Sequence, residues 1–381
     1  MSFSVYVHLP FCATRCDYCD FVSTAATTIP FDEYTAAVHR EWAARAPLFE
    51  GACASVYVGG GTPSLWPAPA LARLLAPLIP GGECEVTVEL NPGDCDRAWL
   101  EAAARAGVNR LSVGVQALDD DRLRWLTRRH DSAQARRAVI EARRVGAFSV
   151  SADIIYGTPR QDAASLSAEL TALLDLGPDH VSAYELTVTA DTPLGRRARR
   201  RDLGLPGSDE MIELWSTVGS LLSERGLARY EVSSYARAGH RSRHNERYWR
   251  GGVYAGLGAG AHGFSRGPAG MIRYANTDDI NEYMGHVRSA RGVDGIGDGG
   301  LTERLTAAQH ALELVMLGLR TTDGVRRDDI AALIDGDRLR SFDQIASALR
   351  SEGFVSTSDD RVVPTAQGLL NADLLAARFT F

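Results

Sequence analysis

Short apolar segments alternate with amphipathic segments through the first half of the chain. The apolar segments are rich in β-branched residues and predict strands at residues 4–10, 54–60, 85–91, 110–116, 149–156 and 180–186. The segments between them carry apolar residues at helical spacing and predict helices at residues 31–45, 68–79, 96–106, 132–145 and 162–176. This alternation predicts right-handed βαβ units and a parallel sheet covered by helices. It suits either a doubly wound sheet or an incomplete barrel of the eight-stranded type.

The second half of the chain changes character. A helix is predicted at residues 208–224, a strand near residues 230–235, and a glycine- and aromatic-rich segment follows at residues 243–264. Helical patterns then cover residues 302–319, 326–333 and 338–352, before a short β-like piece and a helix at residues 365–377. We therefore predict a core at residues 1–235, a connecting segment at 236–300 that packs on the core, and a small, mainly helical, winged-helix-like domain at 301–381.

Polar and glycine-rich residues follow the predicted strands. In chain order these are Cys12, Cys16 and Cys19, then the glycines at 59–61, then Glu89, Gln116 and Asp153. In both candidate folds the functional residues lie at the carboxyl ends of the parallel strands, along one edge of the sheet. The sequence thus predicts one functional site built from several strand ends.

The composition excludes several enzyme classes. All 41 residues of the Lys and Arg total are arginine, a bias that a G+C-rich genome explains. Without lysine, the chain cannot form a pyridoxal Schiff base, present a P-loop lysine or supply a kinase ATP lysine.

Charge and hydropathy limit the partners and the cellular location that we expect for the protein. A net charge of −7 argues against a partner nucleic acid. No apolar run reaches about 18 residues, so no transmembrane segment is expected, although peripheral membrane contact stays open. There is no secretory signal, and six cysteines are too few for a disulfide scaffold. We expect a cytoplasmic protein.

Three cysteines crowd together as Cys12-x3-Cys16-x2-Cys19. Thiolates select zinc or iron–sulfur clusters. A structural zinc site needs four ligands, and neither His8 nor His39 is an obvious fourth. Three cysteines on a [4Fe–4S] cluster would leave one iron open to a small molecule, although most such clusters have four cysteines. A zinc-stabilised binding module stays open as an alternative. The other cysteines, Cys53, Cys84 and Cys95, lack metal-site spacing and are interpreted as small buried residues.

The cysteines lie within the pattern YxHxPFCxxxCxYCxF at residues 6–21, and GGGTPS, ELNP, GVQ, DIIYG and HNERYW follow along the chain. This pattern resembles the signature of radical S-adenosylmethionine (SAM) proteins. It resembles most the branch that contains oxygen-independent coproporphyrinogen III oxidase and the HemW-type haem chaperones. The resemblance covers nearly the whole chain. It implies an α/β fold, an incomplete (β/α)6 TIM-like barrel with a small C-terminal domain.

The resemblance also implies cofactors. A [4Fe–4S] cluster would be held by Cys12, Cys16 and Cys19, with SAM on its open iron. A reduced flavodoxin or ferredoxin would supply the electron that cleaves SAM to methionine and a 5′-deoxyadenosyl radical. By resemblance, a first SAM site maps to Tyr6, Gly60 and Glu89, and a second to Tyr18, Gly61, Thr62, Gln116, Arg128 and Asp153. From the residues alone, the glycines could instead form a tight turn, and Arg128, next to Arg129, could be a solvated helix charge.

Two features separate the members of this branch. The oxidase pattern has a further cysteine two positions after the third ligand, whereas Asp20 and Phe21 follow Cys19 here, which argues against oxidase activity. The motif from His244 to Trp249 resembles one of the chaperone branch that is thought to contribute to haem binding. Imidazole is a common haem ligand, so His244 is the leading candidate and His262 a weaker one. Alternatively, His244 is a hydrogen-bonded residue that orders an aromatic loop.

These observations predict a haem chaperone that binds the cluster, SAM and haem and passes haem to an acceptor protein. The alternative is an active radical SAM enzyme: a coproporphyrinogen decarboxylase, or a methyltransferase or cyclopropanase that uses two SAM molecules. Whether the protein is an enzyme stays open. The arginine run at residues 195–201 could pair with haem propionates or with an acidic electron donor, or it could form a solvated helix face.

Overall fold

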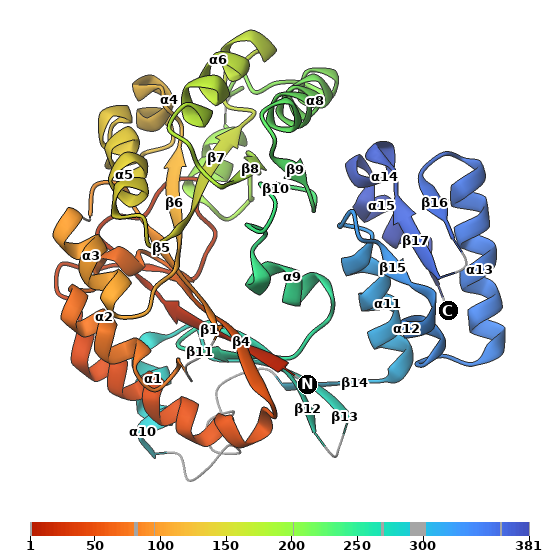
Figure 1. Cartoon of the computed structure of the whole chain (residues 1–381), viewed down its shortest axis with the longest axis horizontal. Helices are drawn as coiled ribbons and strands as arrows, with labels where there is room; N and C mark the ends of the chain where they lie inside the picture. Colours follow the sequence, from red (N-terminus) through yellow and green to blue (C-terminus); the bar gives the residue numbers. More distant parts are fainter. Residues whose placement is uncertain are drawn as a thin grey trace.

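The computed structural model describes residues 2–79, 83–94, 96–200, 202–267, 270–289, 302–358 and 360–380. Its main body is one curved, twelve-stranded sheet in the order β14-β13-β12-β11-β1-β4-β5-β6-β7-β8-β10-β9 (Figure 1). The central strands run parallel to one another and are β11 (Tyr254–Leu257), β1 (Ser2–Leu9), β4 (Ala52–Gly60), β5 (Glu85–Leu90), β6 (Arg110–Gln116), β7 (Ser149–Tyr156) and β8 (His180–Glu185).

Helices cover the outer side of the curved sheet (Figure 1). They are α1 (Phe31–Arg45), α2 (Ala68–Leu75), α3 (Arg97–Arg105), α4 (Asp120–Trp125), α5 (Ser132–Val145), α6 (Ala163–Leu174) and α8 (Ser208–Glu224). Because the parallel strands are covered in this way, their apolar side chains form one continuous buried core. The predicted α/β barrel is confirmed. It is incomplete, since β14 (Thr302–Leu305) and β9 (Ala228–Arg229) stand at opposite ends of the strand order.

Several predicted elements differ from the structure. The helix expected at 68–79 ends at Leu75, because Pro77 has no N–H with which to continue the helical hydrogen bonds. The strand expected near 230–235 is two short strands, β9 and β10 (Ser234–Ala236). The helix expected at 302–319 begins as strand β14, and α11 (Ala307–Gly318) starts only after Thr306, whose side chain accepts a hydrogen bond from the Gln309 N–H.

The glycine-rich segment is part of the sheet. It contains α9 (Arg243–Trp249), β11, the hairpin strands β12 (His262–Gly267) and β13 (Gly270–Ala275), and then α10 (Ile280–Ser289). The buried carboxylate of Glu41 on α1 holds this region, because it accepts hydrogen bonds from Arg45, from the Tyr283 hydroxyl and from the Gly258 N–H. A chain segment without a clear strand pattern thus completes the sheet beside β1.

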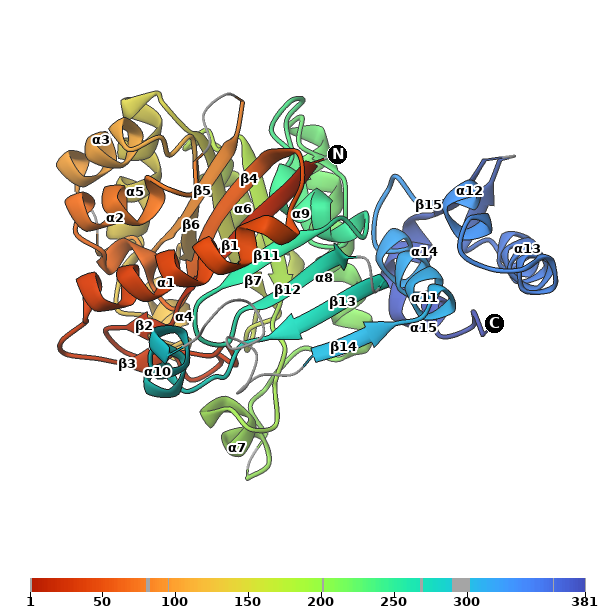
Figure 2. The same cartoon turned by 90° about the horizontal axis from the view of Figure 1, so that it is seen from below.

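The C-terminal unit has its own hydrophobic core, separate from that of the sheet. Its helices are α11, α12 (Arg327–Ala331), α13 (Gly336–Ser351), α14 (Ala366–Leu370) and α15 (Ala372–Ala376), and its small sheet pairs β15 (Val325–Arg326), β17 (Arg361–Pro364) and β16 (Val355–Thr357). The helix expected at 365–377 is thus two helices that meet at Asn371. Figure 2 shows this unit beside the sheet, next to β13 and β14. Among the described residues, no helix is long and apolar enough to cross a bilayer.

The turn after β4 is locked against the chain that leaves β1. The Gly61 N–H donates to the Leu9 carbonyl, and the Thr62 N–H donates to the Phe11 carbonyl. A Cβ on Gly61 would lie 2.6 Å from the carbonyl oxygen of Phe11, closer than side chains approach backbone. The glycine is therefore needed for packing within the protein.

We expect Gly61→Ala to lower the free energy of unfolding by about 2 kcal/mol, the usual cost of forcing an extra methyl into a packed site. Urea denaturation of the cluster-free protein measures this change. Gly285→Ala on α10 is the matched control, because a Cβ there meets nothing within 4 Å, and alanine should leave stability unchanged or higher. Equal stability of the two variants would contradict the prediction.

Candidate cluster and cofactor site

The three predicted cluster ligands lie on one loop. Its base is closed by β2 (Phe11–Cys12) pairing with β3 (Thr24–Ala25). Cys12 is buried, Cys16 and Cys19 are half-buried, and all three are free thiols. Burial raises the pKa of the Cys19 thiol, and the neighbouring thiols of Cys16 and Cys12 raise it further. The hydroxyl of Thr62, after β4, donates to Cys12 Sγ at 3.5 Å.

The donor set fits a cluster better than a single ion. Within the described part of the chain, no three His, Cys, Asp or Glu side chains are grouped as they would be around one metal ion. In a [4Fe–4S] cluster each thiolate binds a different iron, so the ligands need not converge on one point. A closed zinc site would need four convergent ligands. The loop therefore suits the larger group.

Arg128 points at the cysteine loop. Its Nη1 lies 3.6 Å from Cys16 Sγ and 3.5 Å from the Tyr18 hydroxyl, and its Nη2 donates to Asn91 Oδ1 at 2.6 Å. Its Nε is buried and has no hydrogen-bond partner. Arg129 instead pairs with Asp94 at 3.3 Å. Arg128 is thus no solvated helix charge, and Asn91, which the sequence analysis did not single out, orients it.

A clamp on Asp17, inside the loop, was also missed. Arg197 on α7 (Pro193–Ala198) pairs with the Asp17 carboxylate at 2.8 Å. The Asp17 carbonyl accepts from the Leu194 N–H at 2.9 Å, and its own N–H donates to Thr127 Oγ1 at 2.8 Å. One arginine of the run at 195–201 therefore holds the cluster loop. Arg196 only bonds the local Asp191 carbonyl, and Arg201 lies outside the described residues.

We expect Arg197→Ala to change stability by only about 0.5 kcal/mol, because the pair is partly exposed. The larger effect should fall on the loop, so that a reconstituted cluster is lost faster in air. The decay of the visible cluster absorption measures this rate. Arg196→Ala is the matched control, and equal decay rates for the two variants would show that the clamp does not matter.

Two half-buried carboxylates lie behind the loop, on β5 and β7. Glu89 accepts hydrogen bonds from the Tyr57 hydroxyl at 2.8 Å and from the Gly60 N–H at 3.1 Å. Burial nevertheless raises the pKa of Glu89 to about 7, and the charge of Asp153 contributes. Asp153 accepts from Ser112 Oγ at 2.8 Å, and burial raises its pKa as well. A cation that binds beside these two carboxylates would lower the pKa of both.

Tyr6 and Gly60 meet at His8. The Tyr6 hydroxyl is 2.9 Å from His8 Nδ1, and His8 Nε2 is 2.7 Å from the Val22 carbonyl of the cysteine loop. Gly60 has φ +113°, and a Cβ there would lie 2.7 Å from the His8 ring. The imidazole therefore ties β1, the turn after β4 and the loop together, and this histidine's role was not predicted.

Gln116 ends β6 in a strained conformation. Its φ is +63°, which is uncommon for a residue other than glycine, and the pairing of β6 with β7 shifts register just before it. Such strain costs about 1–3 kcal/mol and often marks functional sites. The Gln116 amide nitrogen lies near Gly114, as does Arg128. The site thus gathers the predicted residues from β1, β4, β5, β6 and β7.

His244 belongs to α9, and its ring lies against Tyr57 of β4 and Tyr6 of β1, with ring centroids 5.0 and 6.3 Å apart. Its Nδ1 is 2.9 Å from Ser55 Oγ, its Nε2 is 2.7 Å from the Tyr248 hydroxyl, and the residue is 1% exposed. Burial lowers the pKa of His244 to about 3, so its ring is neutral. Both nitrogens are therefore engaged within the protein, as in the loop-ordering role left open above. Cys53 and Cys84, close by on β4 and before β5, are buried as predicted, whereas Cys95 lies outside the described residues.

We expect His244→Ala to lower the free energy of unfolding by about 2 kcal/mol, because it removes the partner of the Tyr248 hydroxyl and one of the two partners of Ser55 Oγ. Chemical denaturation of the cluster-free protein gives the value. His39→Ala is the control, since that half-buried ring makes a hydrogen bond of 3.1 Å to the Leu74 carbonyl. An unchanged midpoint for His244→Ala would rule out the structural role.

The open parallel barrel, with three free cysteines on the loop after its first strand, defines a radical SAM protein. Residues 6–168 match the model of the radical SAM superfamily, and residues 305–370 match that of the HemN C-terminal domain. The structure of coproporphyrinogen III oxidase from Escherichia coli superposes with a TM-score of 0.84, covering 99% of this chain and 90% of the other at 22% identity. That likeness shows a shared fold.

Sequence relatives give the narrower family. The heme chaperone HemW of Mycobacterium tuberculosis is 36% identical over 97% of this chain and 93% of its own length. The heme chaperone HemW of Bacillus subtilis is 32% identical over 96% of each chain. The chain belongs to the HemW family of radical SAM proteins. Membership of the radical SAM superfamily implies a [4Fe–4S] cluster and SAM.

Proposed function

We propose that this protein is a haem chaperone, which binds a [4Fe–4S] cluster, SAM and haem and transfers haem to an acceptor protein. The observation that carries the proposal is the nearly full-length likeness to proteins named heme chaperone HemW. The residues after Cys19 support it, because Asp20 and Phe21 stand where the oxidase pattern has a further cysteine. The same fold as the oxidase can thus serve a different function.

In this proposal Cys12, Cys16 and Cys19 hold the cluster. When bound, cluster and SAM supply the chemistry of reductive SAM cleavage. The protein's own contribution is electrostatic: Thr62 donates to one cysteine sulfur, and Arg128 places a guanidinium beside another. Both groups stand where they can hydrogen-bond to sulfur atoms that would hold the cluster.

The carboxylates and glycines would hold SAM. Tyr6, Gly60 and Glu89 would form a first site, with Glu89 as the acceptor for ribose hydroxyls. The remaining residues would serve a second: Tyr18, Gly61, Thr62, Gln116, Arg128 and Asp153. The N–H groups of Gly60, Gly61 and Thr62 already donate within the protein and so are not free for a ligand's carboxylate, whereas its amino group would need acceptors such as backbone carbonyl oxygens.

The partners follow from this role. An acceptor of haem is required, and a reduced flavodoxin or ferredoxin would donate electrons to the cluster. The described cysteines are free thiols, which fits a reducing compartment such as the cytoplasm.

Anaerobic reconstitution followed by haem titration tests the proposal. The reconstituted protein should bind haem stoichiometrically and pass it to apomyoglobin, a probe acceptor. With dithionite and SAM it should leave coproporphyrinogen unchanged. Turnover of coproporphyrinogen, or no haem binding, would overturn the chaperone function and favour the active enzyme.

A further inference from the structure

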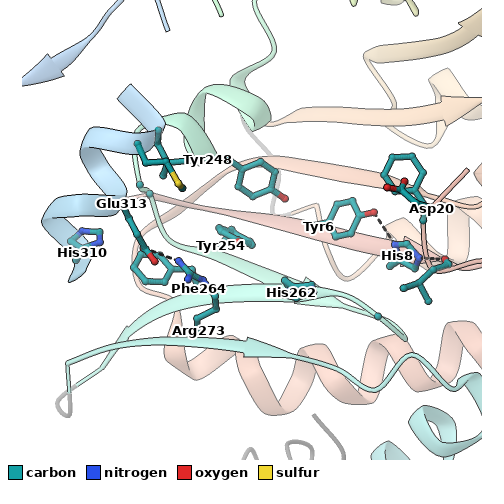
Figure 3. Close-up of a pocket in the computed structure, with 17 residues that line it drawn as sticks. Tyr6, His8, Asp20, Tyr248, Tyr254, His262, Phe264, Arg273, His310 and Glu313 are labelled. Atoms are coloured by element: carbon teal, nitrogen blue, oxygen red, sulfur yellow. Dashed lines mark hydrogen bonds and ion pairs between the residues drawn. The ribbon is translucent and has the colours of Figure 1, made fainter. Parts of the chain in front are cut away.

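A cavity of about 540 Å³ opens between the sheet and the C-terminal unit. Its walls come from β1, the cysteine loop, the α9–β11 connection, the β12–β13 hairpin and α11 (Figure 3). The volume lies within the usual range for sites of organic ligands. One end reaches Tyr6 and Asp20 near the cluster loop, and the other reaches His310 and Met316 on α11.

Aromatic rings dominate the middle of the cavity. Tyr248, Tyr254 and Phe264 line it, and the rings of Tyr248 and Tyr254 meet edge to face at 4.5 Å between centroids. His262 on β12 also lines it and is exposed. Flat apolar walls with a few polar groups suit a large planar ligand.

The Nδ1 atom of His310 has no hydrogen-bond partner among the described residues. The residue is 4% exposed, yet its Nδ1 is buried without a hydrogen bond. Its ring stacks on Phe264 with centroids 5.5 Å apart, and its Cε1 lies 3.5 Å from where a Cβ on Gly251 would stand. A buried polar atom without a partner costs about 1–3 kcal/mol, so it calls for an explanation.

The cavity lining carries two acids, Asp20 and Glu313. Arg273 is the one cation among its described lining residues, and Glu313 pairs with it at 2.7 Å. Burial lowers the pKa of His310, which keeps its imidazole in the neutral form that binds metals. Met316, 39% exposed, lies one helical turn and a half further along α11 at the rim of the cavity.

We infer that this cavity is the haem site and that His310 of the C-terminal unit supplies the imidazole ligand to iron. The inference rests on the proposed haem-chaperone function. It differs from assigning the iron to His244, whose two ring nitrogens are bonded to Ser55 and Tyr248. In this arrangement Tyr248 of the HNERYW motif contributes a wall of the cavity, while His244 positions Tyr248. Haem would then lie between the radical SAM sheet and a unit with a separate core, in a place where a shift of that unit would release it.

Haem titration of the reconstituted, full-length protein tests the inference. His310→Ala should weaken haem binding at least about tenfold and shift the Soret band, and added imidazole should restore the band. Met316→Trp should fill the cavity mouth and also weaken binding, while cluster absorption and SAM binding stay as in the wild type. His286→Ala on α10, outside the cavity, should bind haem like the wild type.

The outcomes separate the two claims. If the wild type binds haem and both His310→Ala and Met316→Trp bind it equally well, the cavity is not the site and the inference is overturned. The same holds if only His244→Ala loses the band. If the wild type binds no haem at all, the proposed function itself has failed, and the inference with it.

Discussion

Alanine at Cys12, Cys16 or Cys19 should abolish the intact cluster. Thiolates are the ligands that hold iron–sulfur clusters, and the three come from one loop whose base is closed by the β2–β3 pairing. The described structure offers no other sulfur beside them, because Cys53 and Cys84 are buried under α9. Visible absorption and bound iron after anaerobic reconstitution should both fall to the level of the untreated protein.

Cys53→Ala is the matched control for this prediction. It also removes a free thiol, but one whose hydrogen bond goes to the Ser55 carbonyl at 3.4 Å. The reconstituted control should keep the full cluster absorption. A single loop variant that retains cluster and iron would mean that the other two cysteines suffice or that another residue can replace the missing ligand. In either case the three-cysteine assignment would be wrong.

The sequence predicted the sheet well, because each parallel strand is covered by helices and so carries a continuous apolar signal. The bounds expected for β6 and β7 match the structure. The sequence-based prediction failed where the local hydrophobic pattern differs from the strand pairing of the folded protein. Residues 302–305 continue a helix-like pattern, yet they form β14 because β13 offers an open edge for pairing. The joining of β11 to β1 was likewise invisible, since only four residues of a glycine-rich segment take part.

Predicting the site required contacts that are distant in sequence. The cysteine motif marks its own loop, but nothing in the spacing shows that Arg197, 180 positions after Asp17, clamps it. The same is true of Asn91, which bonds Arg128 across 37 positions. A strand-end polar residue was the usable signal for Asn91, because it directly follows β5. For Arg197 no such signal exists, because nothing in the sequence separates it from the neighbouring arginines of the run.

The loop and the cavity share one wall. His8 contacts both Tyr6 and the Val22 carbonyl, and all three residues line the cavity inferred to take haem. A change at the cluster loop could therefore reach the cavity through a chain of direct contacts. This coupling would connect the redox and SAM chemistry of the loop to the retention of haem, which distinguishes a regulated chaperone from a passive haem carrier.

The last prediction concerns the pH dependence of stability, which we expect Glu89 to shape. Its folded-state pKa is about 7, against an ordinary value of 4.5, because burial disfavours the charged form. Between these two values the folded protein holds a proton that the unfolded chain has lost. Stability contributed by this proton is therefore full below the unfolded value and is lost as the pH rises toward 7.

Replacing Glu89 by glutamine should remove this loss, because glutamine does not titrate. The free energy of unfolding of Glu89→Gln minus that of the wild type should increase by about 2.5 kcal/mol between about pH 5 and about pH 8. Urea denaturation of the cluster-free proteins across this range measures the difference. The absolute offset between them is a separate quantity, since the carboxylate accepts from both the Tyr57 hydroxyl and the Gly60 N–H, whereas a glutamine amide has only one oxygen to accept with. Glu224→Gln, on the exposed side of α8, should run parallel to the wild type at every pH. Parallel curves for Glu89→Gln as well would show that Glu89 is ionised in the folded protein throughout, and that the site already holds enough positive potential to keep it charged without a bound ligand.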